Sequence, residues 1–163
     1  MYFYYGAEGL TGFNLNGTSY YYKKNLQGDI IGIIDTNGEE IVKYVYDAWG
    51  NHKAYNAKTN DLLDISSYES YINTSNLEQF IAIKNPFRYR GYYYDFETGL
   101  YYLNSRYYDP ELGRFINADD TAILSEGKEF INGLNLYAYC NSNPVMHSDQ
   151  TGAAWWNPFS WDW

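Results

Sequence analysis

Apolar and polar residues alternate in short runs along most of the chain, with turn residues between the runs. The clearest run is Glu39–Asp47, EEIVKYVYD. Its odd-numbered positions Ile41, Lys43 and Val45 would face one side of a strand, and Val42, Tyr44 and Tyr46 the other. Asn16-Gly17 joins GFNL to TSYYY and is a signal for a type I′ hairpin. Further turn pairs, Gly28-Asp29 and Asn37-Gly38, flank the strand DIIGIID. The pattern predicts successive antiparallel hairpins.

The densest pattern lies in residues 85–119 and contains an internal repeat. Tyr92–Leu103 (YYYDFETGLYYL) aligns with Arg106–Asn117 (RYYDPELGRFIN) at an offset of 14 residues. Both copies carry Tyr-Tyr-Asp, then Glu two positions later and Gly four positions after the Asp. Tyrosine suits a pleated, half-buried surface, and Asp and Gly supply the hydrogen bond and the positive φ of a turn. Each copy is therefore predicted to be a strand, a turn and a strand, so that two copies form a meander.

The stretch from residue 51 to residue 82 breaks this pattern, because it is polar and poorer in tyrosine. We interpret it as a connector; a variable surface loop is the alternative. Ser75 and Glu78 have capping-box spacing before LEQFIAI, which predicts a short helix. Pro86 would end that helix, because the residue before proline avoids the α region. Periodicity alone leaves NLYAYC, further along the chain, as either a helical turn or a strand.

Composition narrows the function classes. The chain has 163 residues, enough for a real core, and 21 of them are tyrosine. Its formal net charge of −9 repels phosphate backbones and argues against nucleic-acid binding. One cysteine excludes an intrachain disulfide, and two histidines with that cysteine make no metal site, so no cofactor is expected. The sequence contains no signal peptide and no apolar run long enough to span a membrane.

These motifs resemble the Rhs/YD-repeat family, which includes bacterial polymorphic toxins, the C components of insecticidal toxin complexes, and teneurins. The resemblance is to its C-terminal repeat-associated core and covers roughly Tyr20 to Gly152. It implies a mainly β fold: a Tyr-rich antiparallel hairpin meander, part of a spiralling shell, with one or two short helices. It also implies a short helix near Tyr139, ended by Asn143-Pro144.

On this basis we expect four segments. Residues 1–50 are YD-repeat hairpins, 51–84 a connector with a short helix, 85–152 the Rhs core, and 153–163 a Trp-rich tail. The expected partners are an upstream YD-repeat shell, a C-terminal effector, and an immunity or delivery protein. The first residues begin in mid-pattern, so we interpret the chain as part of a longer protein that is secreted or displayed on the cell surface.

The resemblance also implies self-cleavage just after an Asp-Pro-x-Gly turn, at an aspartyl-type site. Carried over by motif, the site residues are Arg106 in NSRYYDP, Asp119 in GRFINAD and Asp149 in SDQTG. Two nearby carboxylates do not both ionise readily, so one acts as acid and the other as base. An arginine holds one carboxylate charged or stabilises the developing oxyanion.

The chain departs from the family motif at this turn. Gln150 replaces the proline, Ala153 replaces a larger apolar residue, and only about ten residues follow. The alternative to self-cleavage is therefore a non-enzymatic structural or cell-surface remnant. In that case Asp149 caps a turn, Asp119 accepts backbone hydrogen bonds at a strand end, and Arg106 stacks on tyrosines. A carbohydrate-binding module, using exposed aromatic rings, is a third and weaker hypothesis.

The remaining polar residues favour structural roles. Asp47, Asp95 and Asp109 are predicted turn formers. The other arginines of interest are expected to pair with acidic residues or stack on rings: Arg88, Arg90 and Arg114. Cys140 is predicted to be an inert core residue and His147 to be exposed to solvent. The Trp-rich tail is predicted to fold back as an apolar plug, the alternative being an exposed patch for a partner.

Overall fold

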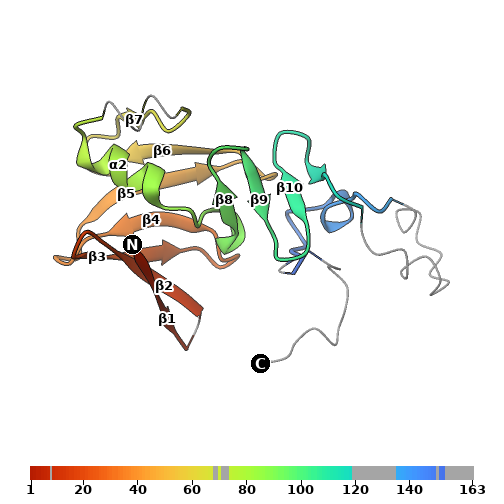
Figure 1. Ribbon diagram of the computed structural model, residues 1–163, viewed down its shortest axis with the longest axis horizontal. Helices are drawn as coiled ribbons and strands as arrows, with labels where there is room; N and C mark the ends of the chain where they lie inside the picture. The colour runs from red at the N-terminus through yellow and green to blue at the C-terminus, as the bar shows by residue number, and fades with distance from the viewer. Residues whose placement is uncertain (8, 68–69, 71–73, 119–134, 150, 153–163) are drawn as a thin grey trace. The chain divides into compact units, whose positions relative to one another are not determined.

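The computed structural model describes residues 1–7, 9–67, 70, 74–118, 135–149 and 151–152. The chain divides into two compact units. The first comprises Met1–Asp47 with His52–Gly91, and the second Ala48–Asn51 with Tyr92–Trp163. Each unit is built on its own antiparallel sheet (Figure 1). The predicted fold class, a mainly β, Tyr-rich hairpin meander, is confirmed.

The first unit holds a seven-stranded sheet in which each strand pairs with the next along the chain. The strands are β1 (Tyr2–Gly6), β2 (Gly9–Leu15), β3 (Thr18–Lys24), β4 (Ile30–Ile34), β5 (Glu40–Tyr46), β6 (His52–Asn56) and β7 (Leu62–Leu63). In β5 the predicted alternation is present, with Val42 and Tyr44 buried and Lys43 and Val45 exposed. The β2–β3 turn has positive φ at Asn16 (52°) and Gly17 (89°), which a type I′ turn requires.

Helix α2 (Leu77–Lys84) packs on β5, β6 and β7 of this sheet. Its buried residues Ile81 and Ala82 join a core that includes Phe13, Ile33 and Val42. The predicted capping box is wrong by one residue. Asn76, not Ser75, is the N-cap, and its side chain accepts a hydrogen bond from the Gln79 amide at 2.9 Å. The helix ends before Pro86, as predicted.

Buried tyrosines anchor the segment after α2. Burial raises the pKa of Tyr22 and of Tyr44, so both hydroxyls keep their protons and act as donors. Tyr22 donates to Asn85 Oδ1 at 2.7 Å, and Tyr44 to the Ala82 carbonyl at 2.9 Å. The sheet and the helix end are thereby joined through polar contacts inside the unit.

The second unit holds a four-stranded sheet in the order β11-β10-β9-β8. Its strands are β8 (Tyr93–Asp95), β9 (Leu100–Tyr102), β10 (Tyr107–Asp109) and β11 (Arg114–Phe115). The short helix expected near Tyr139 is a single 3-10 turn, η2 (Cys140–Ser142), capped by Asn143. All three of its residues have positive φ, between 49° and 59°, so this turn is left-handed.

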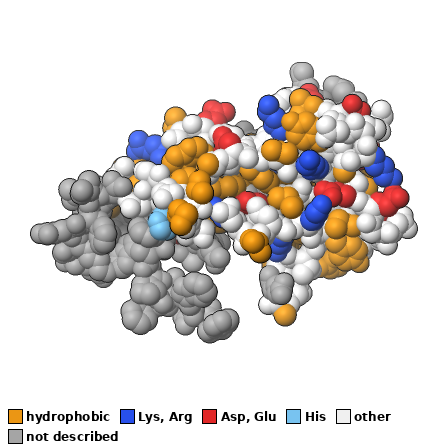
Figure 2. Space-filling model, turned by 180° about the vertical axis from the view of Figure 1, so that it is seen from behind, with side chains coloured by type: hydrophobic (Ala, Val, Ile, Leu, Met, Phe, Trp, Pro, Cys, Tyr) orange, Lys and Arg blue, Asp and Glu red, His pale blue; other side chains and the backbone are white. Residues whose placement is uncertain are grey.

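Basic and acidic side chains are interspersed over the surface with exposed apolar ones (Figure 2). Some of these charged side chains form ion pairs in the first unit: Lys23 with Glu40 and Lys58 with Glu39. Within the described ranges, no helix is long and apolar enough to cross a membrane.

Candidate functional site

The candidate site rests on two tandem hairpins, β8–β9 and β10–β11, which are the two predicted repeat copies. In the first, Gly99 has a φ of 74° and its amide donates to the Asp95 carbonyl at 2.8 Å. In the second, Gly113 has a φ of 65°, and Asp109 Oδ1 accepts from the Glu111 amide at 2.8 Å. Both turns therefore form as their Asp and Gly residues predict.

The buried face of this sheet is a row of aromatic rings. Tyr101, Tyr108 and Phe115 have no solvent exposure. The Tyr101 hydroxyl donates to the Gly50 carbonyl at 2.9 Å, and the Tyr108 hydroxyl to the Trp49 carbonyl at 2.7 Å. The three rings thus fill the core, and the two tyrosine hydroxyls satisfy backbone carbonyls.

Asp149 begins a tight turn that ends at Gly152. Its side chain is 2 % exposed, and Oδ1 accepts from the amides of Gly152 at 2.8 Å and Thr151 at 3.3 Å. Gly152 has a φ of 71°, and a Cβ there would lie 2.5 Å from the Leu103 carbonyl oxygen. Only glycine therefore fits at the end of this turn.

Arg106 holds the turn from the start of the second hairpin. Its side chain is 6 % exposed, and Nη2 lies 3.3 Å from Asp149 Oδ2. Nε donates to the Gly152 carbonyl, and Nη1 to the Leu136 carbonyl at 3.1 Å. The guanidinium carbon lies 3.6 Å from the centroid of the Phe115 ring. The buried positive charge is therefore matched by a carboxylate, two carbonyls and an aromatic face.

The structure thus brings together two of the three predicted site residues, Arg106 and Asp149. Asp119 lies outside the described residues, as do Gln150 and the tail from residue 153 onward. The catalytic role of all three remains a prediction. No group of three His, Cys, Asp or Glu side chains in the described part of the chain could hold a metal ion.

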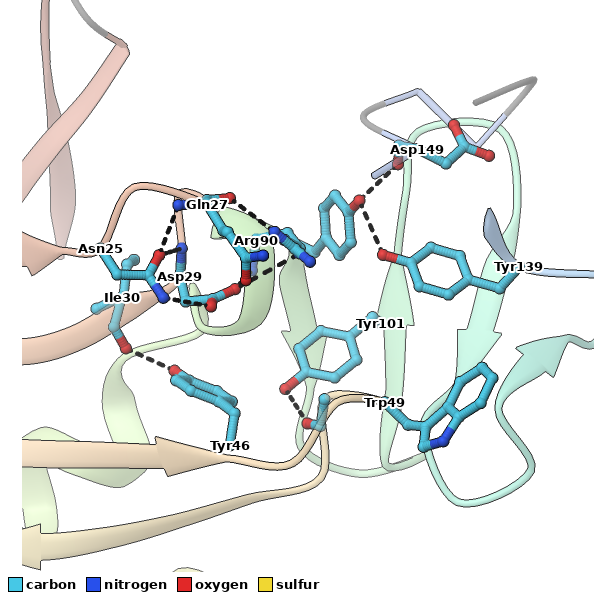
Figure 3. Close-up of polar contacts among 12 residues, drawn as sticks. Asn25, Gln27, Asp29, Ile30, Tyr46, Trp49, Arg90, Tyr101, Tyr139 and Asp149 are labelled. Carbon is cyan, nitrogen blue, oxygen red and sulfur yellow. Dashed lines mark hydrogen bonds and ion pairs between the residues drawn. The ribbon is translucent and has the colours of Figure 1, made fainter. Parts of the chain in front are cut away.

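Sequence reasoning missed two residues that also hold the turn. The Tyr92 hydroxyl donates to the Asp149 carbonyl at 2.6 Å and lies 3.3 Å from the Tyr139 hydroxyl. Figure 3 draws these contacts as dashed lines from Asp149 and Tyr139 to the tyrosine between them. Ser105 donates its hydroxyl to the Thr151 carbonyl at 2.9 Å. The repeat alignment held a signal for Tyr92, since it occupies the position of Arg106 in the first copy.

The other arginines have the structural roles that the sequence favours. Arg88 is fully buried, donates to the Ala82 carbonyl at 3.3 Å, and lies 5.9 Å from the Tyr44 ring centroid. Arg90 forms a buried ion pair with Asp29 at 3.8 Å (Figure 3). Arg114 lies 4.9 Å from the ring centroid of Tyr137.

The remaining candidates can also be placed. Cys140 is buried, as predicted for a core residue. His147 is half-buried rather than fully exposed, and its amide donates to the Asn143 carbonyl.

Comparison with known proteins assigns the family. No family model matches the chain. The tRNA3(Ser)-specific nuclease WapA of Bacillus spizizenii, an Rhs-type polymorphic toxin, is 39 % identical over 153 residues, which is 93 % of this chain. The chain belongs to the Rhs/YD-repeat family. This Rhs chain spans only 6 % of the length of that WapA, so most of the relative lies outside the comparison.

Further similarities agree with the assignment. The toxin protein Tse5 of Pseudomonas aeruginosa is 40 % identical over 67 residues, covering 41 % of the Rhs chain and 5 % of Tse5. Among solved structures, the crystal structure of TcdB2-TccC3-Cdc42 matches with a TM-score of 0.60 and 28 % identity. That match covers 86 % of the Rhs chain and 5 % of the toxin-complex chain. The chain is therefore a toxin-related Rhs domain.

Proposed function

We propose that this chain is the end of an Rhs core that encloses a C-terminal effector and releases it by cutting its own backbone just after the turn at Gly152. One observation carries the proposal: Arg106 and Asp149 form a buried ion pair 3.3 Å long at that turn. A buried charge pair is costly to form, so its presence beside a motif implicated in cleavage favours a functional role.

The chemistry proposed is hydrolysis of one peptide bond. Water adds to the carbonyl carbon, the C–N bond breaks, and the nitrogen leaves as an amine after taking a proton. Asp149 and Asp119 would share the tasks of base and acid. Arg106 would keep Asp149 charged, and its Nε, which donates to the Gly152 carbonyl, would stabilise the negative charge that develops on that oxygen when water adds.

The missing proline at Gln150 does not leave the turn without support. Three side chains from the hairpins bind described carbonyls of the turn: Tyr92 at Asp149, Ser105 at Thr151 and Arg106 at Gly152. Proline stiffens a turn from within by fixing φ. Here hydrogen bonds from residues just before β8 and β10 constrain it from outside, which supports the proposal despite the departure from the family motif.

The upstream shell, the effector and the export route are parts of the same proposal. They are supported by the relatives, which are toxins many times longer than this chain. On this basis the expected partners are an upstream YD-repeat shell, the effector, and an immunity or delivery protein. The expected location is outside the producing cell or on its surface, as part of a larger protein.

The test is the intact mass of the full 163-residue chain after purification. The wild-type chain is expected to yield a large fragment ending just after Gly152. Asp149→Asn and Arg106→Lys are expected to leave the chain whole. Asn has no negative charge, and Lys keeps the positive charge but cannot reproduce the three guanidinium contacts to Gly152, Leu136 and Asp149. Asp119→Asn, tested in parallel, is expected to do the same if Asp119 is the second carboxylate.

Asp109→Asn is the matched control. Asp109 accepts two turn amides through Oδ1, from Glu111 at 2.8 Å and Leu112 at 3.0 Å, much as Asp149 does. The Asp109→Asn chain should be cut like the wild type. A wild-type chain that keeps its full mass after prolonged incubation would contradict the proposal.

One observation favours the alternative of a non-enzymatic remnant. Both carboxylate oxygens of Asp149 are already engaged, Oδ1 by two amides and Oδ2 by Arg106. A purely structural aspartate would look the same. In that case the wild-type chain and every variant keep their full length. Asp149→Asn then lowers only the stability of the second unit.

A further inference from the structure

Two buried phenol hydroxyls form a chain of hydrogen bonds to the main chain of Asp149. Tyr92 is 6 % exposed, and its hydroxyl lies 2.6 Å from the Asp149 carbonyl oxygen. Tyr139 has no exposure, and its hydroxyl lies 3.3 Å from that of Tyr92. Asp149 is therefore contacted through its main chain as well as through its carboxylate.

The direction of these hydrogen bonds follows from the groups themselves. A carbonyl oxygen only accepts, so Tyr92 must donate its single hydroxyl hydrogen to Asp149. The bond between the two phenols then needs its hydrogen from Tyr139. The order is Tyr139 to Tyr92 to the Asp149 carbonyl, and a bond donated in the same direction along such a chain strengthens the next one.

The two ends of Asp149 are held by equivalent positions of the two hairpins. Tyr92 binds the carbonyl, and Arg106, at the same place in the second copy, binds the carboxylate. With both ends fixed, the carboxylate stays 3.3 Å from the guanidinium. Without the carbonyl contact, the main chain of Asp149 could shift, and its carboxylate would then move relative to Arg106 and to the two turn amides that it accepts from.

We propose that Tyr92 is a positioning residue of the cleavage site and that Tyr139 supports it as the donor to its hydroxyl. The proposal rests on the self-cleavage proposed above. Neither tyrosine acts on the bond that breaks. Tyr92 acts through Asp149, keeping its carboxylate charged and aimed by keeping it beside Arg106.

The test compares Tyr92→Phe with Tyr101→Phe in the full chain. Tyr101 is the matched control, because it is a buried tyrosine of the same sheet whose hydroxyl also donates to a backbone carbonyl, that of Gly50 at 2.9 Å. The chain is made by cell-free synthesis, synthesis is stopped, and the cut fraction is followed over time from pH 4 to pH 9.

Tyr92→Phe is expected to slow cleavage roughly 10-fold at neutral pH. It should also move the acidic limb of the pH–rate profile to higher pH, because Asp149 loses part of the positive partner that favours its charged form. Tyr101→Phe should leave both the rate and the acidic limb close to those of the wild type. A purely structural loss would lower the thermal midpoint without moving the limb.

Tyr139→Phe is a second, milder variant for the case that Tyr92→Phe does not fold. It keeps the Tyr92 hydroxyl and is expected to slow cleavage roughly 3-fold. If the wild-type chain is cut, and Tyr92→Phe and Tyr139→Phe are cut at the same rate and with the same pH profile, the positioning role of Tyr92 is overturned and the proposed cleavage stands. A wild-type chain that is not cut would overturn the proposed cleavage and this role together.

Discussion

The two hairpin copies of the second unit share the Asp and Gly of their turns and begin with different residues. Asp95 and Asp109 occupy equivalent positions, as do Gly99 and Gly113, and both turns have the same construction. The first position of each copy differs, being a tyrosine in one and Arg106 in the other. Both side chains nevertheless reach the turn that begins at Asp149. Each copy therefore supplies one side chain to the turn from its first position, a neutral hydroxyl from Tyr92 and a positive charge from Arg106.

A second difference between the copies concerns the ring that packs beside Arg106. Position 101 in the first copy is a tyrosine whose hydroxyl binds a backbone carbonyl, and its equivalent in the second copy is Phe115. The face of that ring lies 3.6 Å from the guanidinium carbon of Arg106. A buried phenol there would need its own hydrogen-bond partner. Phenylalanine has no hydroxyl to satisfy and leaves the ring face for the cation.

The largest expected effect comes from removing the charge. Arg106→Met should lower the free energy of unfolding by about 3–5 kcal/mol, because it leaves the buried Asp149 carboxylate without its cation. Tyr92→Phe, the equivalent change in the first copy, should cost only about 1–2 kcal/mol, since it removes one neutral donor. Urea unfolding of the full chain measures both.

Adding Asp149→Asn to Arg106→Met should recover part of the loss, because the unpaired charge is then gone. Equal costs for Arg106→Met and Tyr92→Phe would contradict the distinction between a charged and a neutral contact to the turn.

The next effect separates the two turn glycines. Both have positive φ, so an alanine at either position should cost about 1–2 kcal/mol of backbone strain. A Cβ at Gly113 would also lie 2.9 Å from the Trp49 ring, whereas a Cβ at Gly99 would lie 3.8 Å from the Tyr94 hydroxyl. Gly113→Ala should therefore cost about 1–3 kcal/mol more than Gly99→Ala. Thermal unfolding of the pair decides this, and identical midpoints would contradict it.

The smallest effect concerns the turn aspartates. Asp109 Oδ1 accepts from two amides, at 2.8 and 3.0 Å, and Asp95 Oδ1 accepts from the Glu97 amide at 3.0 Å. These bonds are exposed to solvent, so Asp109→Ala and Asp95→Ala should each cost only about 0.5–1.5 kcal/mol. Chemical denaturation is precise enough to compare them. If either variant lowered the free energy of unfolding as much as Arg106→Met, the turn aspartates would stabilise more of the unit than their own turns.

Local turn chemistry made most of the hairpin architecture predictable. Asn16-Gly17 and the two Asp-to-Gly turns of the second unit depend on residues within one turn, so a linear pattern contains their signal. The helix was predicted for the same reason, although its cap fell on Asn76 instead of Ser75. Either side chain has an oxygen that can cap a helix, and the choice depends on how the preceding chain enters.

The arrangement around Asp149 was only half predictable. Arg106 and Asp149 were found through motifs of a family, and nothing in their spacing along the chain places them in contact. Tyr92 was missed because tyrosine is abundant here, so its alignment with Arg106 did not set it apart from the other buried rings. Its contact with Asp149 spans 57 residues, and no periodicity extends that far.

The same sequence separations bear on the order in which the molecule folds. Each hairpin closes between neighbouring strands, but the bonds to the turn close loops of 43, 46 and 57 residues. Longer loops cost more entropy to close and are slower to form. We expect the turn to dock after both hairpins have formed, because they carry the side chains that bind it. Formation of the contact between Arg106 and Asp149 would then report that the sheet is complete.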